Sequence, residues 1–210
     1  MFKNVSDNGF LSILHSCVKK PLLIWDKKIR SGHIRRIMDN ELQCLVLELK
    51  GKKLNNTYLT CPGNYKKTLG VKFPVIILTI KYLYKYFAFD IQILDDNNVR
   101  RKFKISTLVS QPDVKPFTCK LPLVLTEGWN QIAFSLQEYT KKIYNTNYYE
   151  TLRIQVYPNC RIQRIYFTDE IPNEDPSEYN NNNNNNNNNI NKKNNILLDS
   201  QYLIGSLKKR

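Results

Sequence analysis

Alternating apolar and polar residues recur along much of this chain, and they are most regular in a basic segment near its middle. There Phe103 and Ile105 share one parity, whereas Arg100 and Lys102 share the other. Successive side chains of a β-strand point to opposite faces of a sheet. The pattern therefore predicts a strand with an apolar inner face and a cationic outer face. Arg101 has the parity of Phe103, so we expect it to reach the rim of the core or to pair with a carboxylate.

Further strands are predicted wherever the same alternation returns. These segments are residues 45–49, 87–93, 131–136, 152–156 and 161–168. Polar residues 95–98 separate the second of them from the basic strand, as the loop of a hairpin does. In the last segment the apolar parity switches between Ile162 and Ile165, which predicts a β-bulge near Gln163 and Arg164.

One short helix is predicted at residues 138–144, where the residues follow helical spacing and Thr146 and Asn147 provide a stop. Many short strands separated by turns, with little helix, are typical of an all-β protein with a single β-sandwich or jelly-roll-like domain. We expect this domain to comprise residues 1–172.

The chain after residue 172 has a different composition. A polar segment leads into a pure asparagine run at residues 180–189, and such sequences cannot bury enough apolar surface to fold. Residues 196–207 have a weak apolar pattern that fits a short helix less well than it fits disorder. We therefore predict a disordered, Asn-rich tail at residues 173–210, which the domain does not need in order to fold.

The chain is strongly basic, and the charge belongs to the predicted domain. Its 210 residues carry a net charge of +14, while residues 173–210 contain nearly equal numbers of basic and acidic residues. A basic surface favours anionic partners such as nucleic acid, anionic lipid or acidic protein tails.

No catalytic or cofactor-binding pattern stands out. The two histidines, His15 and His33, do not lie at ligand spacing from cysteines or carboxylates. The sequence also lacks a local nucleophile signature and a glycine-rich phosphate loop. We therefore predict that the protein is not an enzyme and holds no metal or cofactor.

The cysteines and the apolar runs bear on the cellular compartment. The five cysteines have no CxxC spacing, and we expect them to be reduced, buried thiols: Cys17, Cys44, Cys61, Cys119 and Cys160. The N-terminal residues do not form a signal peptide, and the apolar run at residues 75–80 is too short to cross a bilayer. A cytosolic or nuclear protein without membrane contact is expected. Trp25 and Trp129 are expected to pack in the core.

Cationic clusters supply the candidate binding residues. Four clusters contain arginine, and the side chains that we select from charge and parity as the contact with an anionic partner are Lys27, Lys28, Arg30, Arg35, Arg36, Arg100, Lys102 and Arg161.

Several long motifs, at residues 20–28, 32–37, 94–101, 128–132 and 159–162, resemble the cilia- and flagella-associated protein 20 family. The resemblance spans about residues 1–170. It implies a compact β-sandwich with a structural role at the inner junction of axonemal doublet microtubules. There the protein would bind tubulin of the A- and B-tubules beside the Parkin co-regulated gene protein. His15 and Met38 depart from the residues usual in the family, and the Asn-rich tail has no counterpart in it.

The leading hypothesis is thus a non-enzymatic inner-junction protein that supports axoneme stability, cilium assembly and motility. The resemblance implies a location in the axoneme, basal body and cytoskeleton, with a nuclear pool in some lineages. One alternative is a nuclear or nucleic-acid-associated regulatory protein, although the basic strand lacks the interleaved aromatic residues that single-strand binders use. A second alternative is a carbohydrate-binding module, which the missing signal peptide disfavours.

Overall fold

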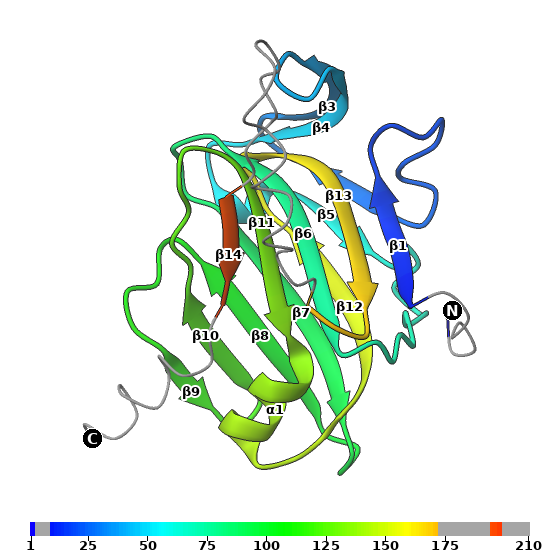
Figure 1. Cartoon of the computed structure of the whole chain (residues 1–210), viewed down its shortest axis with the longest axis vertical. Coiled ribbons are helices and arrows are strands. Elements are labelled where there is room, and N and C mark those ends of the chain that lie inside the picture. Colours follow the sequence, from blue (N-terminus) through cyan, green and yellow to red (C-terminus); the bar gives the residue numbers. More distant parts are fainter. Residues whose placement is uncertain (3–8, 172–193, 199–210) are drawn as a thin grey trace, which may run out of the picture.

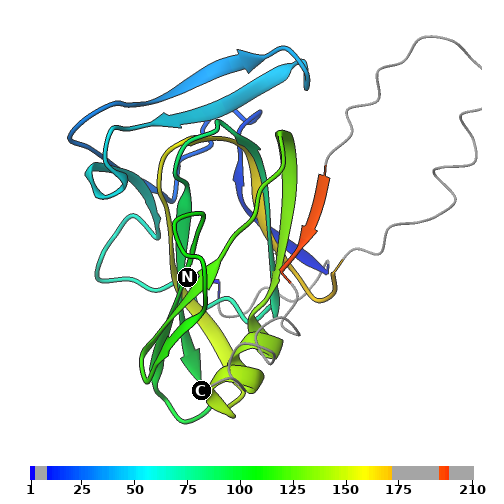
Figure 2. The same cartoon turned by 90° about the vertical axis from the view of Figure 1, so that its left-hand side faces the viewer.

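The computed structural model describes residues 1–2, 9–171 and 194–198. Strands of the described part form two seven-stranded sheets that pack face to face (Figures 1 and 2). The predicted all-β sandwich with one short helix is confirmed.

The first sheet, which we call sheet A, has β1 paired with β13 beside its main path. Its strands, in spatial order, are β14 (Asn194–Leu197), β11 (Gly128–Ser135), β6 (Val75–Tyr82), β13 (Cys160–Thr168), β4 (Cys44–Lys50) and β3 (His33–Asp39), with β1 (Phe10–His15) on β13.

The second sheet, sheet B, forms the other layer. Its order is β2 (Asp26–Ile29), β5 (Thr57–Cys61), β12 (Tyr148–Val156), β7 (Ala88–Asp95), β8 (Arg100–Ser106), β10 (Thr118–Pro122) and β9 (Asp113–Lys115). A 3₁₀ turn, η1 (Leu54–Asn56), precedes β5, and the helix α1 (Leu136–Tyr144) follows β11.

The core lies between the two sheets and is rich in aromatic residues. The ring centroids of Phe103 on β8 and Phe134 on β11 are 5.5 Å apart, so they join the two layers. Both side chains are fully buried. Burial of a phenylalanine contributes about 1.5–3 kcal/mol, which makes these alternating apolar residues the main source of stability.

The local predictions for β8 and β13 are confirmed. Phe103 and Ile105 are fully buried, while Arg100 is exposed. The pairing of β13 with β6 shifts register between Ile162 and Arg164, which places the β-bulge where the parity switch predicted it.

The helix begins two residues before its predicted start because Ser135 acts as its N-cap. The Ser135 hydroxyl accepts a hydrogen bond from the N–H of Glu138 at 3.3 Å. At the other end Asn145 adopts φ 55°, and its N–H donates to the carbonyl oxygen of Lys141.

A short additional strand lies within the stretch predicted as tail, at residues 194–197. These residues form β14, which pairs in parallel with β11 and lies along the edge of sheet A (Figures 1 and 2). The N–H of Leu198 donates to the carbonyl oxygen of Ala133, and Leu198 packs against the core. The weak apolar pattern therefore belongs to a strand at this point. Residues 172–193 and 199–210 lie outside the described part, so the boundary at residue 172 stays a prediction.

Both tryptophans pack in the interior, as expected. The indole N–H of Trp25 donates to the carbonyl oxygen of Ile13 at 2.7 Å, and that of Trp129 donates to Asp39 at 3.3 Å. The expectation that all cysteines are buried is wrong for Cys17, which is exposed, and for Cys44, which is half-buried.

Candidate partner-binding surface

A groove with a volume of about 390 Å³ lies where β2 and β3, edge strands of the two sheets, come together. We call it the basic groove, and its lining residues are Lys19, Lys20, Pro21, Leu22, Leu23, Lys27, Ile34, Arg35, Arg36 and Leu47. Half of these residues are cations, and the described lining contains no carboxylate. Because grouped cations raise the local concentration of anions, the groove suits an acidic partner.

The turn between β2 and β3 brings two of the groove walls together. Gly32 has a φ of +98°, and a Cβ added to it would lie 2.0 Å from the carbonyl oxygen of Lys50. A residue with a side chain does not fit there, so glycine lets the chain pass directly from sheet B to sheet A. Lys27 on β2 and Arg35 on β3 therefore line one groove.

Arg36 positions the loop that forms the third wall. Its Nη2 donates to the carbonyl oxygen of Ser16 at 2.8 Å, and its Nη1 donates to that of Lys19 at 3.4 Å. The loop is also attached to β13, because the buried Ser16 hydroxyl donates to the carbonyl oxygen of Ile162 at 2.5 Å. Arg36 thus supports the fold at the same time as it lines the groove.

Sequence reasoning missed two of the groove cations. Lys19 and Lys20 are exposed and belong to the loop that Arg36 holds. Their adjacency before Pro21 was the available signal. It did not count as a cluster because it contains no arginine.

A row of charged side chains crosses the outer face of sheet A. Arg35 on β3 lies opposite Glu48 on β4, Glu48 opposite Arg161 on β13, and Arg161 opposite Lys81 on β6. The side chain of Glu48 is only 1% exposed, and it accepts hydrogen bonds from Arg35 at 3.0 Å and Arg161 at 3.1 Å, with His33 2.9 Å away.

The surroundings of Glu48 keep it ionised. Burial opposes the charged form, but the hydrogen bonds from His33, Arg35 and Arg161 outweigh it and lower the pKa of Glu48 from 4.5 to about 2. A buried carboxylate with such partners is a structural anchor.

Asp39 is a second buried carboxylate in the same network. Its Oδ2 lies 2.8 Å from Nη1 of Arg161, and its Oδ1 accepts hydrogen bonds from Trp129 and from the N–H of Glu41. Burial raises the pKa of Asp39, but the hydrogen bond from Arg161 and the other donors hold it below its ordinary value. Arg161 thus bridges two buried carboxylates and is only 25% exposed, which leaves little of it for a partner.

The cations of sheet B have different roles from one another. Arg101 is 12% exposed, pairs with Asp95 at 2.9 Å and lies 4.4 Å from the ring centroid of Tyr144. The expectation that it pairs with a carboxylate is confirmed. Lys102 faces outward but pairs with Asp90 at 3.0 Å. Arg100 is exposed and forms no ion pair with other described residues.

The predicted binding residues do not form one continuous surface. Lys27, Arg35 and Arg36 meet in the basic groove, while Lys28 lies over the ring of Tyr58 and Arg30 is exposed at the end of β2. Arg100 and Lys102 lie on the outer face of sheet B. Arg161 lies on the outer face of sheet A, on the opposite side of the sandwich.

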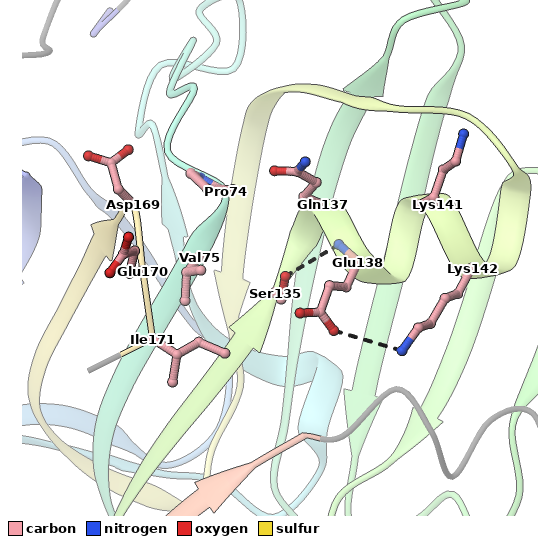
Figure 3. Close-up of a pocket in the computed structure, with 10 residues that line it drawn as sticks. All are labelled: Pro74, Val75, Ser135, Gln137, Glu138, Lys141, Lys142, Asp169, Glu170 and Ile171. Carbon is pink, nitrogen blue, oxygen red and sulfur yellow. Dashed lines mark hydrogen bonds and ion pairs between the residues drawn. The ribbon is translucent and has the colours of Figure 1, made fainter. Parts of the chain in front are cut away.

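A larger pocket, of about 510 Å³, lies beside α1 at the other end of the sandwich. Figure 3 shows Glu138, Lys141 and Lys142 on the helix, opposite Asp169, Glu170 and Ile171 at the end of β13. Glu138 and Lys142 are 3.9 Å apart. Because the lining contains both carboxylates and lysines, this pocket does not select an anionic partner.

Neither a metal site nor a membrane-spanning helix occurs among the described residues. Within residues 1–2, 9–171 and 194–198, no group of three or more His, Cys, Asp or Glu side chains could hold a metal ion. In the same part of the chain, no helix is long and apolar enough to span a bilayer.

Comparison with known proteins gives the class. The model of the CFA20 domain matches residues 1–186. A cilia- and flagella-associated protein 20 of Chlamydomonas reinhardtii is 52% identical over 181 residues, which cover 85% of this chain and 95% of the relative. The proteins of the same name from Paramecium tetraurelia and Caenorhabditis elegans are 51% and 47% identical to this chain. The 181 aligned residues cover 95% and 89% of these two relatives.

The sandwich and these matches define a CFA20-domain protein. The chain belongs to the cilia- and flagella-associated protein 20 family, as the motifs at residues 20–37 and 94–101 indicated. It is therefore a protein of the cilium- and flagellum-associated class, and its family names do not describe an enzyme.

Proposed function

We propose that this chain is a non-enzymatic structural protein of the axoneme that binds tubulin at the inner junction of doublet microtubules. The observation that carries the proposal is the basic groove, whose cations come from two sheets and a loop while no carboxylate joins its described lining. Tubulin surfaces are acidic, so the charges are complementary. Binding there would support axoneme stability, cilium assembly and motility.

The groove also offers apolar contact. Leu23 is 78% exposed and lies beside Lys27 and Lys20 in the lining. Charged side chains alone leave water in an interface. An exposed leucine among them can add apolar contact area from which water is excluded. The combination favours a folded protein partner over a simple polyanion.

The predicted cations outside the groove have two different roles in the proposal. Lys28, Arg30, Arg100 and Lys102 are candidates for further contacts with tubulin or with a Parkin co-regulated gene protein-like neighbour. Arg161 is assigned a supporting role, because it bridges Asp39 and Glu48. A location in the axoneme and basal body, with a nuclear pool in some lineages, belongs to the same proposal.

Charge reversal in the groove tests the proposal. We expect the double variant Lys19→Glu/Lys20→Glu to bind doublet microtubules about tenfold or more weakly, since reversed charges at an acidic surface cost on the order of 1 kcal/mol each. Co-sedimentation over a salt series measures this effect. Wild-type affinity should fall as salt rises, because exposed charges are screened beyond about 8 Å at physiological ionic strength.

A matched double variant controls for net charge. Lys115→Glu/Lys141→Glu makes the same change on β9 and α1, at the end of the sandwich opposite β3 (Figure 1). It should bind nearly as well as wild type. Equal loss in both variants would mean that only overall charge matters, and stronger binding to salt-matched DNA than to microtubules would favour a nucleic-acid partner.

A further inference from the structure

Two cysteines that are distant in sequence meet beside the basic groove. Cys17 is exposed in the loop after β1, and Cys44 is the half-buried first residue of β4. The Cys17 thiol donates to the carbonyl oxygen of Leu45, with its sulfur 3.6 Å from that oxygen. Since Leu45 directly follows Cys44, the Cys17 sulfur lies against the start of β4.

The bulge of β13 fixes both cysteines in place. The N–H of Ser16 donates to the carbonyl oxygen of Gln163 at 2.9 Å, and the side chain of Gln163 acts on the Cys44 thiol by lowering its pKa. The Cys17 thiol also helps to raise the pKa of Cys44, so the two thiols are neighbours. Neighbouring thiols are thus held between rigid strands, with one of them open to solvent.

The other three cysteines have no such access. Cys61, Cys119 and Cys160 are fully buried, and burial raises the pKa of Cys61 and of Cys119 to about 12. Buried thiols of this kind are unreactive. The contrast singles out Cys17 and Cys44.

We propose that Cys17 and Cys44 form an oxidation site, at which a small disulfide such as oxidised glutathione converts the two thiols into an intramolecular disulfide. The exposed Cys17 thiol loses its proton to water and attacks one sulfur of oxidised glutathione, so that one glutathione leaves as a thiolate and a mixed disulfide forms on Cys17. Cys44 then loses its proton to water and attacks the Cys17 sulfur, which expels the second glutathione. The protein thiols give up two electrons, and oxidised glutathione is reduced to two molecules of glutathione.

The order of the two steps follows from the surroundings of each thiol. Burial, together with the neighbouring Cys17 thiol and Asp39, raises the pKa of Cys44 above its ordinary value, so Cys44 is the slower nucleophile. Cys17 is therefore the entry thiol and Cys44 the resolving thiol.

The disulfide would have a consequence for the basic groove. It would tie the loop that carries Lys19 and Lys20 to β4, in addition to the hydrogen bonds from Arg36. Fixing this wall reduces the conformations that the loop can adopt when a partner arrives. This consequence rests on the proposed function, whereas formation of the disulfide does not.

Mass spectrometry of the full chain tests the proposal. The native protein is incubated in glutathione redox buffers, free thiols are alkylated, and the digest is searched for peptides joined through Cys17 and Cys44. We expect this cross-link in the wild type. In Cys44→Ser the mixed glutathione disulfide should accumulate on Cys17, because the resolving thiol is missing, and Cys17→Ser should gain neither product.

Two results would overturn the proposal. If the wild type accumulates the mixed disulfide on Cys17 as Cys44→Ser does, the thiols are too far apart to react. If the cross-link appears only after denaturation, the folded arrangement does not support it. Co-sedimentation of oxidised and reduced wild type, with Cys17→Ser as the control, then measures the effect on the groove. Absence of any microtubule binding would contradict the proposed function and leave the oxidation result standing.

Discussion

Glu48 shows why the position of a cation in the sequence does not reveal its role. Three side chains that donate to Glu48 or lie beside it come from positions that looked like a free basic surface: His33, Arg35 and Arg161. Arg161 is 113 residues away from Glu48 in the chain. Local patterns predict which face a side chain takes, but they carry no information on a partner so distant. The position of Lys19 and Lys20 in the groove was not readable from the sequence either, because contacts with Arg36 and Ile162 place their loop.

Removing the Glu48 charge should destabilise the domain. In Glu48→Gln the charge that accepts these hydrogen bonds is lost, and the lowering of the pKa of Glu48 from 4.5 to about 2 corresponds to about 3 kcal/mol of stabilisation. Chemical denaturation should report a decrease of this size. Glu170→Gln changes an exposed carboxylate and should alter the free energy of unfolding by about 0.5 kcal/mol or less.

The wild type and Glu48→Gln should also differ in how their stability responds to acid. The pKa of Glu48 is lowered from 4.5 to about 2 in the folded state, so its ionisation stabilises the fold above pH 4.5. That contribution is lost as the pH falls from 4.5 towards 2. The wild type should therefore lose more stability than Glu48→Gln across this window. Parallel pH curves for the two proteins would show that Glu48 is not the group responsible.

At the scale of the element, alternation was sufficient to predict β8 and the bulge in β13. Both are determined by the period-2 pattern of a half-buried strand, since a slip of one residue would expose Phe103 and Ile105. The pattern of β14 was too short to be read in this way. Its pairing with β11 is made by backbone groups, which every residue other than proline possesses, so composition alone pointed to disorder.

Replacement by glutamate should affect the stability of the domain very differently at the two neighbouring arginines of β8. Arg101→Glu places an anion beside Asp95 and removes the contact with Tyr144, so we expect a loss of about 3 kcal/mol or more in unfolding free energy. Arg100→Glu, on the exposed face, should change it by about 0.5 kcal/mol or less. Equal effects in thermal unfolding would contradict the assigned parity.

The packing of β14 can be tested with a matched pair in the tail. Leu198 packs against the core, whereas Leu197 is 54% exposed. We expect Leu198→Ser to release β14 and to increase hydrogen exchange in β11 between Asn130 and Ala133. Leu197→Ser should leave that protection close to the wild-type level. If neither variant changes the exchange, β14 contributes nothing to the protection of this edge.

At the scale of the whole molecule, the cations on the outer face of sheet A and those in the basic groove have different tasks. On sheet A, Arg161 and its partners hold strands β3, β4, β13 and β6 together across the outer face. At the junction of β2 and β3, the exposed Lys19, Lys20 and Lys27 line the groove together with Leu23. Family membership was readable from motifs alone. The division of labour depends on which carboxylates the fold brings to each face, and only the structure gives that.

This division predicts separable effects on stability and binding. Arg161→Met removes the cation between Asp39 and Glu48, so it should lower the unfolding free energy by about 3 kcal/mol. For a domain of this size that loss corresponds to a decrease of about 6–12 °C in Tm. The fraction that stays folded should bind microtubules with nearly wild-type affinity and salt dependence, because Arg161 is largely covered.

Lys19→Glu/Lys20→Glu should show the reverse, with an unchanged Tm and weakened binding. Calorimetry and co-sedimentation on the same samples measure both quantities. If Arg161→Met weakens binding more than its loss of folded protein explains, the outer face of sheet A contacts the partner as well.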